Sequence, residues 1–175
     1  VTGGADGNRD WVTLRNYRDD TGLDADINIR THDIATLGLW GPEAKNALGH
    51  FVDPGEISIE NFPFVTAKHL TLNLSGGKKV DVWAARISYV GESGWELYLN
   101  NDSEDGLALY DSLLEVGVVP VGIETYANSR RLEKSFRLQG ADLETNYNAC
   151  ESAIERRLVK AADFHGKAAH LAHRE

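Results

Sequence analysis

The sequence predicts an α+β fold in which helices cover one side of an antiparallel sheet, and three observations lead to this prediction. Segments typical of strands follow one another through the middle of the chain, between residues 27 and 99. Several of them are joined by tight glycine-rich turns, which favour antiparallel hairpins. Segments with helical spacing come before, between and after the strands, without the regular alternation of a doubly wound parallel sheet.

Two helices and two strands are predicted in the first part of the chain. Asn8 can cap a helix that ends at Gly22. Pro42 opens a second helix, because proline at the first helical position loses no needed hydrogen bond. Between the helices, a period of two in the apolar residues predicts strands at 27–29 and 34–39. The residues of the second helix that we expect to face the core are Ala44, Ala47 and Leu48.

The middle of the chain predicts a series of hairpins. Residues 62–74 mix strand and turn, residues 75–77 form a hairpin tip, and residues 80–89 form a strand. A turn at 91–94 then leads into a strand at 95–99. The residues expected on one face of this last strand are Trp95, Leu97 and Leu99, with Glu96 and Tyr98 on the other face.

Three more helices are predicted in the second half. Ser103 is a cap candidate for a helix that ends at Gly117, and another helix covers about 123–135. Beyond Gly140 the chain is irregular until Asp163, which can cap a short terminal helix. The apolar residues at helical spacing in the first of these helices are Leu107, Tyr110, Leu113 and Leu114.

Composition and charge argue against several functions. The formal charge of -9 and the pI near 5.1 disfavour nucleic acid, because phosphate binding needs clustered Lys and Arg. No apolar stretch approaches the roughly 20 residues that cross a bilayer, so we predict no membrane partner. The single cysteine, Cys150, leaves no internal disulfide, so we expect a reducing compartment such as bacterial cytoplasm or the mitochondrial matrix. The absence of Met predicts a piece of a longer polypeptide.

Three further patterns are weak. The glycine-rich stretch at 3–7 lacks the spacing of phosphate-binding loops, so a plain turn is the better interpretation. Of the histidines near the C-terminus, only His170 and His173 are one helical turn apart, while His165 is not, so we predict no metal site. Cys150 is interpreted as a small packed residue rather than a nucleophile.

The hairpin at 89–96 carries the most informative pattern. By pattern alone it is a tight turn with Glu96 on a solvated face. Its residues, Tyr89-Val90-Gly91-Glu92-Ser93-Gly94-Trp95-Glu96, resemble the signature hairpin of the aminomethyltransferase family of the glycine cleavage system. Segments that are similar to the family in the same order are Leu39-Trp40-Gly41-Pro42-Glu43-Ala44, Ser129-Arg130-Arg131-Leu132-Glu133-Lys134 and Asp163-Phe164-His165-Gly166-Lys167. The two ends of the chain resemble the dimethylglycine and sarcosine dehydrogenase branch.

This resemblance implies a folate-binding role for three residues. Glu96 would accept hydrogen bonds from the pterin ring, and Tyr89 would lie against the folate or bond to it. Arg131 would steady the Glu96 carboxylate or reach a carboxylate or carbonyl of the ligand, and its alternative is a helix-surface ion pair with Glu133 or a neighbour. Glu92 is assigned to the turn. The acidic residue credited with transfer in the family lies upstream, so no catalytic residue is predicted.

The resemblance also implies a domain organisation and an activity. Residues 1–160 would form a folate-binding α+β domain, and residues 161–175 would begin a linker to a C-terminal barrel. The complete protein would be an enzyme that passes a one-carbon unit from an amine such as glycine, dimethylglycine or sarcosine to N5 of tetrahydrofolate. An attached domain with FAD, and other domains or subunits, are candidate partners. The chain alone is expected to be inactive.

Two alternatives stay open. One is a folate-binding or structural relative without transfer activity, and the other is an O- or S-demethylase of the same superfamily. Two positions depart from the family pattern: Arg130 replaces a leucine, and Gln139 stands where an aromatic residue is frequent. The second departure removes a candidate for stacking on the ligand.

Overall fold

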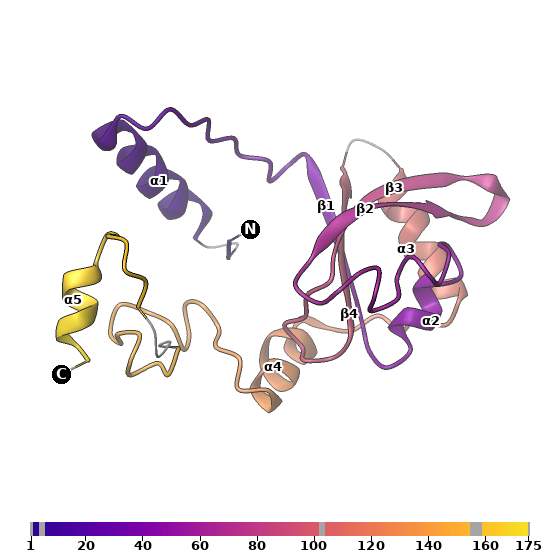
Figure 1. Cartoon of the computed structure of the whole chain (residues 1–175). Helices are drawn as coiled ribbons and strands as arrows, with labels where there is room; N and C mark the ends of the chain where they lie inside the picture. The colour runs from indigo at the N-terminus through magenta and orange to yellow at the C-terminus, as the bar shows by residue number, and fades with distance from the viewer. Residues whose placement is uncertain (1, 4–5, 102–103, 155–158, 175) are drawn as a thin grey trace.

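The computed structural model describes residues 2–3, 6–101, 104–154 and 159–174, and its fold is α+β, as predicted (Figure 1). One sheet holds four antiparallel strands in the order β1-β4-β3-β2. The strands are β1 (Ile34–Trp40), β2 (Ala67–Asn73), β3 (Lys79–Ala85) and β4 (Gly94–Asn100). A short 3-10 turn, η1 (Ser75–Gly77), joins β2 to β3 at the predicted hairpin tip.

Strand β4 lies between β1 and β3. The alternating burial of its residues shows that one face of the sheet packs on the core and that the other face is open. The residues of β4 alternate as predicted, since Trp95, Leu97 and Leu99 are buried while Glu96 and Tyr98 are only partly buried. Apolar side chains on every second residue must leave water together, and this requirement fixes the register of the strand. The face that carries Glu96 and Tyr98 therefore takes no part in the core.

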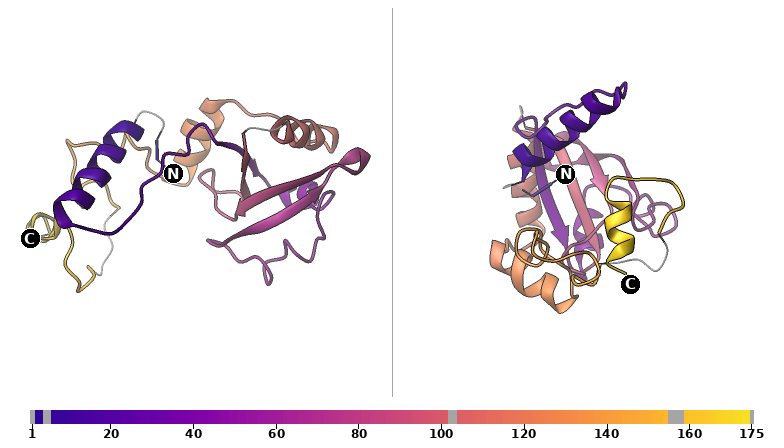
Figure 2. Two further views of the ribbon diagram at one scale, coloured as in Figure 1. Left: turned by 90° about the horizontal axis from the view of Figure 1, so that it is seen from above. Right: turned by 90° about the vertical axis from the view of Figure 1, so that its left-hand side faces the viewer.

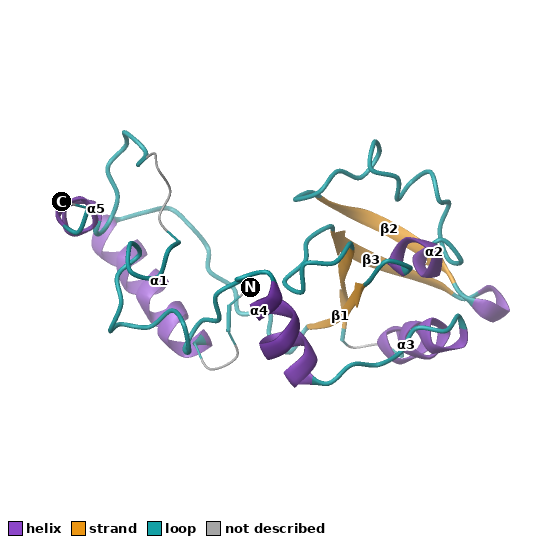
Figure 3. Ribbon diagram, turned by 90° about the horizontal axis from the view of Figure 1, so that it is seen from below, coloured by secondary structure: helices purple, strands orange, loops and turns teal. Residues whose placement is uncertain are grey.

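Helices α2 (Ala44–Leu48) and α3 (Asp105–Glu115) cover the core face (Figure 3). In α2 the predicted residues Ala44, Ala47 and Leu48 are all buried in the core cluster. The core contribution of α3 comes from Leu109 and Leu113. Of the four residues predicted from helical spacing, only Leu113 is buried, because it shares its face of α3 with Leu109. Leu107, Tyr110 and Leu114 are exposed, and the cap candidate Ser103 lies outside the described residues.

Helices α1 (Gly7–Thr21) and α5 (Lys167–Ala172) lie away from the sheet (Figure 2). The predicted stop of α1 is confirmed, because Gly22 adopts the left-handed conformation at φ 65°. The helix begins two residues earlier than predicted, at Gly7, with Asp6 rather than Asn8 at the cap position. Likewise Gly166 precedes α5, rather than the predicted cap Asp163. Neither helix contains a buried residue.

Two predicted strands are wrong in part. Residues 27–29 form no strand, since they pair with no neighbouring segment and Ile29 is 59% exposed. The strand predicted to reach Tyr89 ends at Ala85, where the Ile87 N–H turns back to the Ala85 carbonyl oxygen at 3.0 Å. Residues 86–93 therefore form a loop, and the hairpin is wider than the sequence suggests. The helix predicted at about 123–135 is present as η2 (Thr125–Arg130), a π-helical stretch, followed by α4 (Arg131–Glu133).

We predict that Gly94→Ala destabilises the sheet by about 2 kcal/mol, because overpacking against a rigid partner costs this order of free energy. Gly94 pairs with Trp40, and a Cβ at this position would overlap the Leu39 carbonyl oxygen, which the backbone holds in place. Urea unfolding measures the change. Gly122→Ala is the matched control, since a Cβ there meets no atom within 4 Å and should leave the unfolding midpoint nearly unchanged.

Candidate functional site

Glu96 lies on the open face of the sheet, between two small residues. The register places Gly38 of β1 beside it on one side and Ala85 of β3 on the other. Ala67 of β2 follows in the same row, because it pairs with Ala85. Ala85 and Ala67 have small side chains, so a flat ligand can approach Glu96 from the side of β3.

Tyr98, two residues along β4, shares the open face and orients the carboxylate. Its hydroxyl donates a hydrogen bond to Glu96 Oε2. Burial raises the pKa of the Tyr98 phenol, and the bond to Glu96 raises it further. The phenol therefore stays a donor over the physiological range, and it orients the carboxylate through one lone pair of Oε2, while Oε1 and the second lone pair of Oε2 can accept from another partner.

Trp40 and Tyr126 form a wall beside Glu96. The indole of Trp40 lies over Gly38, where any Cβ would overlap its six-membered ring, and its Nε1–H donates to the Ile87 carbonyl oxygen at 3.0 Å. Tyr126, on the π-helical stretch, stacks on Trp40 with ring centroids 5.4 Å apart. Burial raises the pKa of the Tyr126 phenol first, and the negative charge of Glu96 adds to the shift.

Tyr89 continues this wall away from Glu96. Its ring centroid is 5.5 Å from that of Tyr126 and 6.0 Å from that of Phe136. The ring planes of Tyr89 and Phe136 are 15° apart. The Tyr89 hydroxyl donates to the Arg137 carbonyl oxygen at 2.8 Å, and burial raises the pKa of this phenol. We call Trp40, Tyr126, Tyr89 and Phe136 the aromatic row. It joins the open face of the sheet to the segment that follows α4.

Arg131 is only 4% exposed and lies beneath the segment after α4. Its Nε–H donates to the Ala127 carbonyl oxygen at 2.6 Å, and Nη1 donates to the Phe136 carbonyl oxygen at 3.1 Å and to Asp142. Its carboxylate partner is therefore Asp142, and not Glu96 or Glu133. The pKa of Asp142 is lowered, chiefly by the hydrogen bond from the Leu138 N–H and then by Arg131. A direct contact between Arg131 and a ligand stays a prediction.

Two contacts hold the turn that carries Tyr89 and Glu96. Arg130, the residue that departs from the family pattern, bonds Glu92 at 2.7 Å and Glu133 at 3.1 Å. Gly91, at φ 75°, lies against the stem of Lys134, and a Cβ there would overlap it. Glu92 thus belongs to the turn, as predicted, and α4 is fastened to the turn by side chains as well as by the aromatic row.

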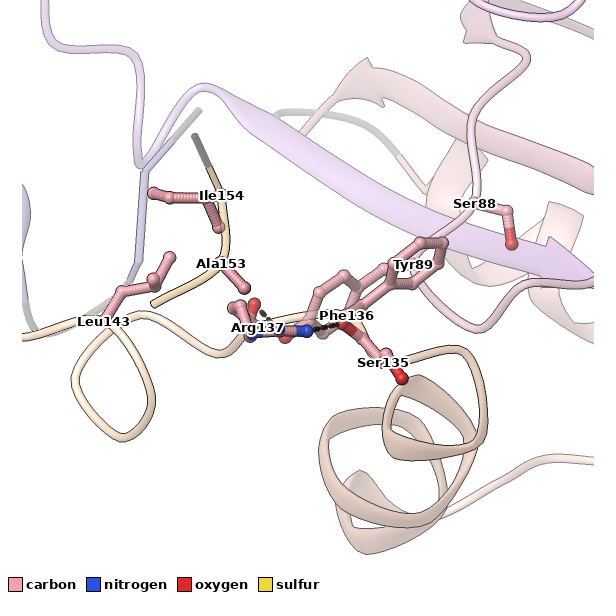
Figure 4. A pocket seen from close by; sticks show the side chains of 8 residues that line it. All are labelled: Ser88, Tyr89, Ser135, Phe136, Arg137, Leu143, Ala153 and Ile154. Atoms are coloured by element: carbon pink, nitrogen blue, oxygen red, sulfur yellow. Dashed lines mark hydrogen bonds between the residues drawn. The ribbon is translucent and has the colours of Figure 1, made fainter. Parts of the chain in front are cut away.

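An open pocket of about 350 Å³ lies at the far end of the aromatic row (Figure 4). Tyr89 and Phe136 line it together with Arg137, Leu143 and Ile154. Figure 4 shows the two rings close together on one side of the pocket and the aliphatic residues on the other.

The sequence predicted Tyr89 and Glu96 as site residues, but it did not single out their aromatic neighbours. Tyr98 had a detectable signal, because a period of two puts it on the face of Glu96. Trp40 stands directly before Gly41-Pro42, a pattern that predicts the start of a helix but no role for Trp40. Tyr126 had no signal, because its place against Trp40 and Tyr89 depends on how η2 packs against β1 and the turn.

The residues that the structure describes contain neither a cluster of metal ligands nor a membrane-spanning helix. Among them, no three His, Cys, Asp or Glu side chains gather in a way that could hold a metal ion. Their helices also include none that is long and apolar enough to cross a bilayer.

Fold and site together define an α+β domain that presents a carboxylate, oriented by a phenol and walled by aromatic rings, on the open face of its sheet. The chain belongs to the GCVT N-terminal domain family, whose model matches residues 1–161.

Individual relatives agree with this family. Mitochondrial dimethylglycine dehydrogenase of Homo sapiens is 38% identical over 154 residues, which are 85% of this chain and 17% of the human protein. An aminomethyltransferase of Thermosynechococcus vestitus is 30% identical over 172 residues, which are 95% of this chain and 42% of the relative. The sarcosine oxidase subunit alpha of a Corynebacterium strain is 28% identical over 171 residues, which are 95% of this chain and 17% of that subunit. The chain thus spans less than half of each of these proteins.

We predict that the phenols of Tyr89, Tyr98 and Tyr126 ionise above the ordinary tyrosine pKa of about 10. Because the folded-state pKa is raised, their stabilising contribution is present below about pH 10 and is lost as the pH rises through the folded value. Ultraviolet titration of wild type, compared with Tyr98→Phe, should show that the variant lacks one late-ionising phenol. Equal titration curves for the two proteins above pH 10, normalised per tyrosine, would contradict the prediction.

We also predict that Arg131→Met lowers the free energy of unfolding by about 2 kcal/mol, because it leaves carbonyl acceptors below α4 without a donor. The neighbouring variant Arg130→Met removes two partly exposed ion pairs, with Glu92 and Glu133, and should cost less than about 1 kcal/mol. Thermal unfolding of the two variants compares them directly. Equal effects would show that Arg131 is not the structural support inferred here.

Proposed function

We propose that this chain is the tetrahydrofolate-binding module of a one-carbon transferase. The observation that carries the proposal is the Glu96 carboxylate, which Tyr98 orients on the open face of the sheet, between the small residue Ala85 on one side and Trp40 over Gly38 on the other. A pterin presents an N–H and an amino group side by side on one edge, and both are donors. An ionised carboxylate offers two acceptors at a matching spacing.

The walls beside Glu96 suit a flat heterocycle. Trp40 and Tyr126 are stacked on each other at 5.4 Å, so they form a rigid apolar boundary. Such a boundary binds an aromatic ligand by stacking and by burial of apolar surface. It also excludes water from the carboxylate, and exclusion of water strengthens charged hydrogen bonds. Tyr89 extends this boundary beyond Tyr126, and we propose that its ring also lies against the folate. We propose that Arg131 acts on the site mainly through Asp142 and Phe136, whose segment it holds in place.

The activity follows from positioning. A nucleophilic nitrogen held at a fixed place turns an encounter with an electrophilic one-carbon unit into an intramolecular reaction. Glu96, Tyr98 and the aromatic row would fix the ring that carries this nitrogen. The residue that handles the proton would come from another part of the complete protein, so the chain alone would bind and orient without turnover.

The names of the relatives support an enzyme that acts on an amine. These relatives are named as dehydrogenases of dimethylglycine, an oxidase subunit for sarcosine, and aminomethyltransferases, so the complete protein would act on a small amine. We propose FAD as a further cofactor of an attached domain, and the bacterial cytoplasm or the mitochondrial matrix as the location.

The test is the affinity of the complete protein for tetrahydrofolate, measured by isothermal titration calorimetry. Glu96→Gln and Glu96→Ala should each weaken binding by about 2 kcal/mol or more, because the amide mispairs with a donor edge and alanine offers no acceptor. Glu115→Gln, on an exposed position of α3, is the matched control and should bind as wild type does.

Two outcomes would contradict the proposal. Wild-type protein that does not bind tetrahydrofolate would remove it altogether. Binding that survives both Glu96 substitutions would show that the carboxylate is not the recognition group. Turnover of an amine donor, measured in the same preparations, separates a transferase from a relative that binds folate without transfer.

A further inference from the structure

The turn at residues 86–93 is held to its neighbours on two sides. On the side of β1 the contacts are neutral hydrogen bonds at the two ends of the turn. The Trp40 Nε1–H donates to the Ile87 carbonyl oxygen at 3.0 Å. The Gly41 N–H donates to the Ser93 carbonyl oxygen at 2.9 Å. These bonds fix where the turn leaves and rejoins the sheet, and they leave its middle to be positioned by another element.

Arg130 makes a charged contact with the middle of the turn. Its Nη2 donates to Glu92 Oε1 at 2.7 Å, and its Nη1 donates to Glu133 Oε2 at 3.1 Å. The second bond orients the guanidinium on its own helix, and the first binds the turn to that helix. A leucine, which the family pattern has at this position, could make neither bond.

Arg130 is also the last residue of the π-helical stretch η2, which carries Tyr126. Tyr126 stacks on Trp40 at 5.4 Å, and its ring is 5.5 Å from that of Tyr89 in the middle of the turn. One ion pair thus links the two segments that supply the rings of Tyr89 and Tyr126. A change in the distance between these segments would move both rings relative to Glu96, which follows the turn in β4.

The other contacts on this side of the turn constrain its place less. Gly91 packs against the stem of Lys134, which is a flexible aliphatic chain. The Tyr89 hydroxyl bonds to the backbone at residue 137, which lies on the segment after α4 and not on η2. The pair of Arg130 and Glu92 is charged and short, and its side chains are 38% and 31% exposed, so it defines a distance between turn and helix.

We propose that Arg130 is a positioning residue of the ligand site. Through Glu92 it sets the place of the turn against η2, so that the rings on these two segments meet the ligand at a fixed spacing. The inference rests on the proposed function, because tetrahydrofolate is the ligand taken to bind at Glu96. Arg130 itself touches no ligand, and its effect falls on ligand affinity more than on the stability of the fold.

The experiment measures the affinity of the complete protein for tetrahydrofolate by isothermal titration calorimetry. Arg130→Met and Glu92→Gln should each weaken binding by about threefold to fivefold, because the ligand must then order the turn itself. The two substitutions change the net charge in opposite directions, so a shared loss excludes simple attraction between the protein and the carboxylates of the ligand. The double variant should bind no more weakly than either single one, because both remove the same contact.

Two further variants separate positioning from a general effect. Arg130→Lys should bind better than Arg130→Met, because an ammonium still pairs with Glu92. Arg18→Met is the matched control, since it removes an ion pair of the same length, 2.7 Å, with Asp19 on α1. It should bind as wild type does. Thermal unfolding of the same preparations shows that each variant is folded.

Four results would overturn this inference while leaving the proposed function intact, provided that Glu96→Gln still loses binding. They are wild-type affinity in both Arg130→Met and Glu92→Gln, a loss in only one of them, losses that add in the double variant, and an equal loss in Arg18→Met. Wild-type protein that does not bind tetrahydrofolate would instead remove the proposed function itself.

Discussion

The alternation of strand β4 is the constraint on which the rest of the molecule depends. Trp95, Leu97 and Leu99 must be buried together, and an extended chain then turns the residues between them to the opposite face. The core is assembled on one side by α2 and α3. Glu96 and Tyr98 are therefore placed on the other side by the same force that stabilises the fold, and neither can move to the core face without a slip of the whole strand.

The open face owes its shape to small residues as much as to large ones. Gly38 admits the indole of Trp40 across β1, and Ala85 leaves the other side of Glu96 low. A π-helical stretch then carries Tyr126 against Trp40, and such stretches are frequent at functional sites. Aromatic packing of this kind adds stability beyond its buried area, so the wall is both a support for the turn and a surface for a ligand.

Charge is distributed unevenly between the two ends of the aromatic row. Glu96 provides a carboxylate at the sheet end, and Arg137 provides a guanidinium at the other end. Arg131 is bound mainly to the protein itself, because its Nε–H and Nη1 donate to Ala127, Phe136 and Asp142. The two arginines differ by six positions in sequence, but only the one that follows the helix lines a pocket. Between them the helix ends at the turn of residues 134–135, where the Phe136 N–H donates to the Arg131 carbonyl oxygen at 2.9 Å.

The sequence by itself determined the fold class, the hairpin that carries Tyr89 and Glu96, the stop at Gly22 and the buried face of α2. These features are local, because periodicity, turn residues and burial of apolar side chains act within a few residues. Tertiary structure alone decided that residues 27–29 stay unpaired and that Leu109 replaces Leu107 on the core face of α3. It also decided that Arg131 pairs with Asp142 and that Tyr126 stacks on Trp40. Those outcomes depend on contacts between segments far apart in the chain, which no local pattern records.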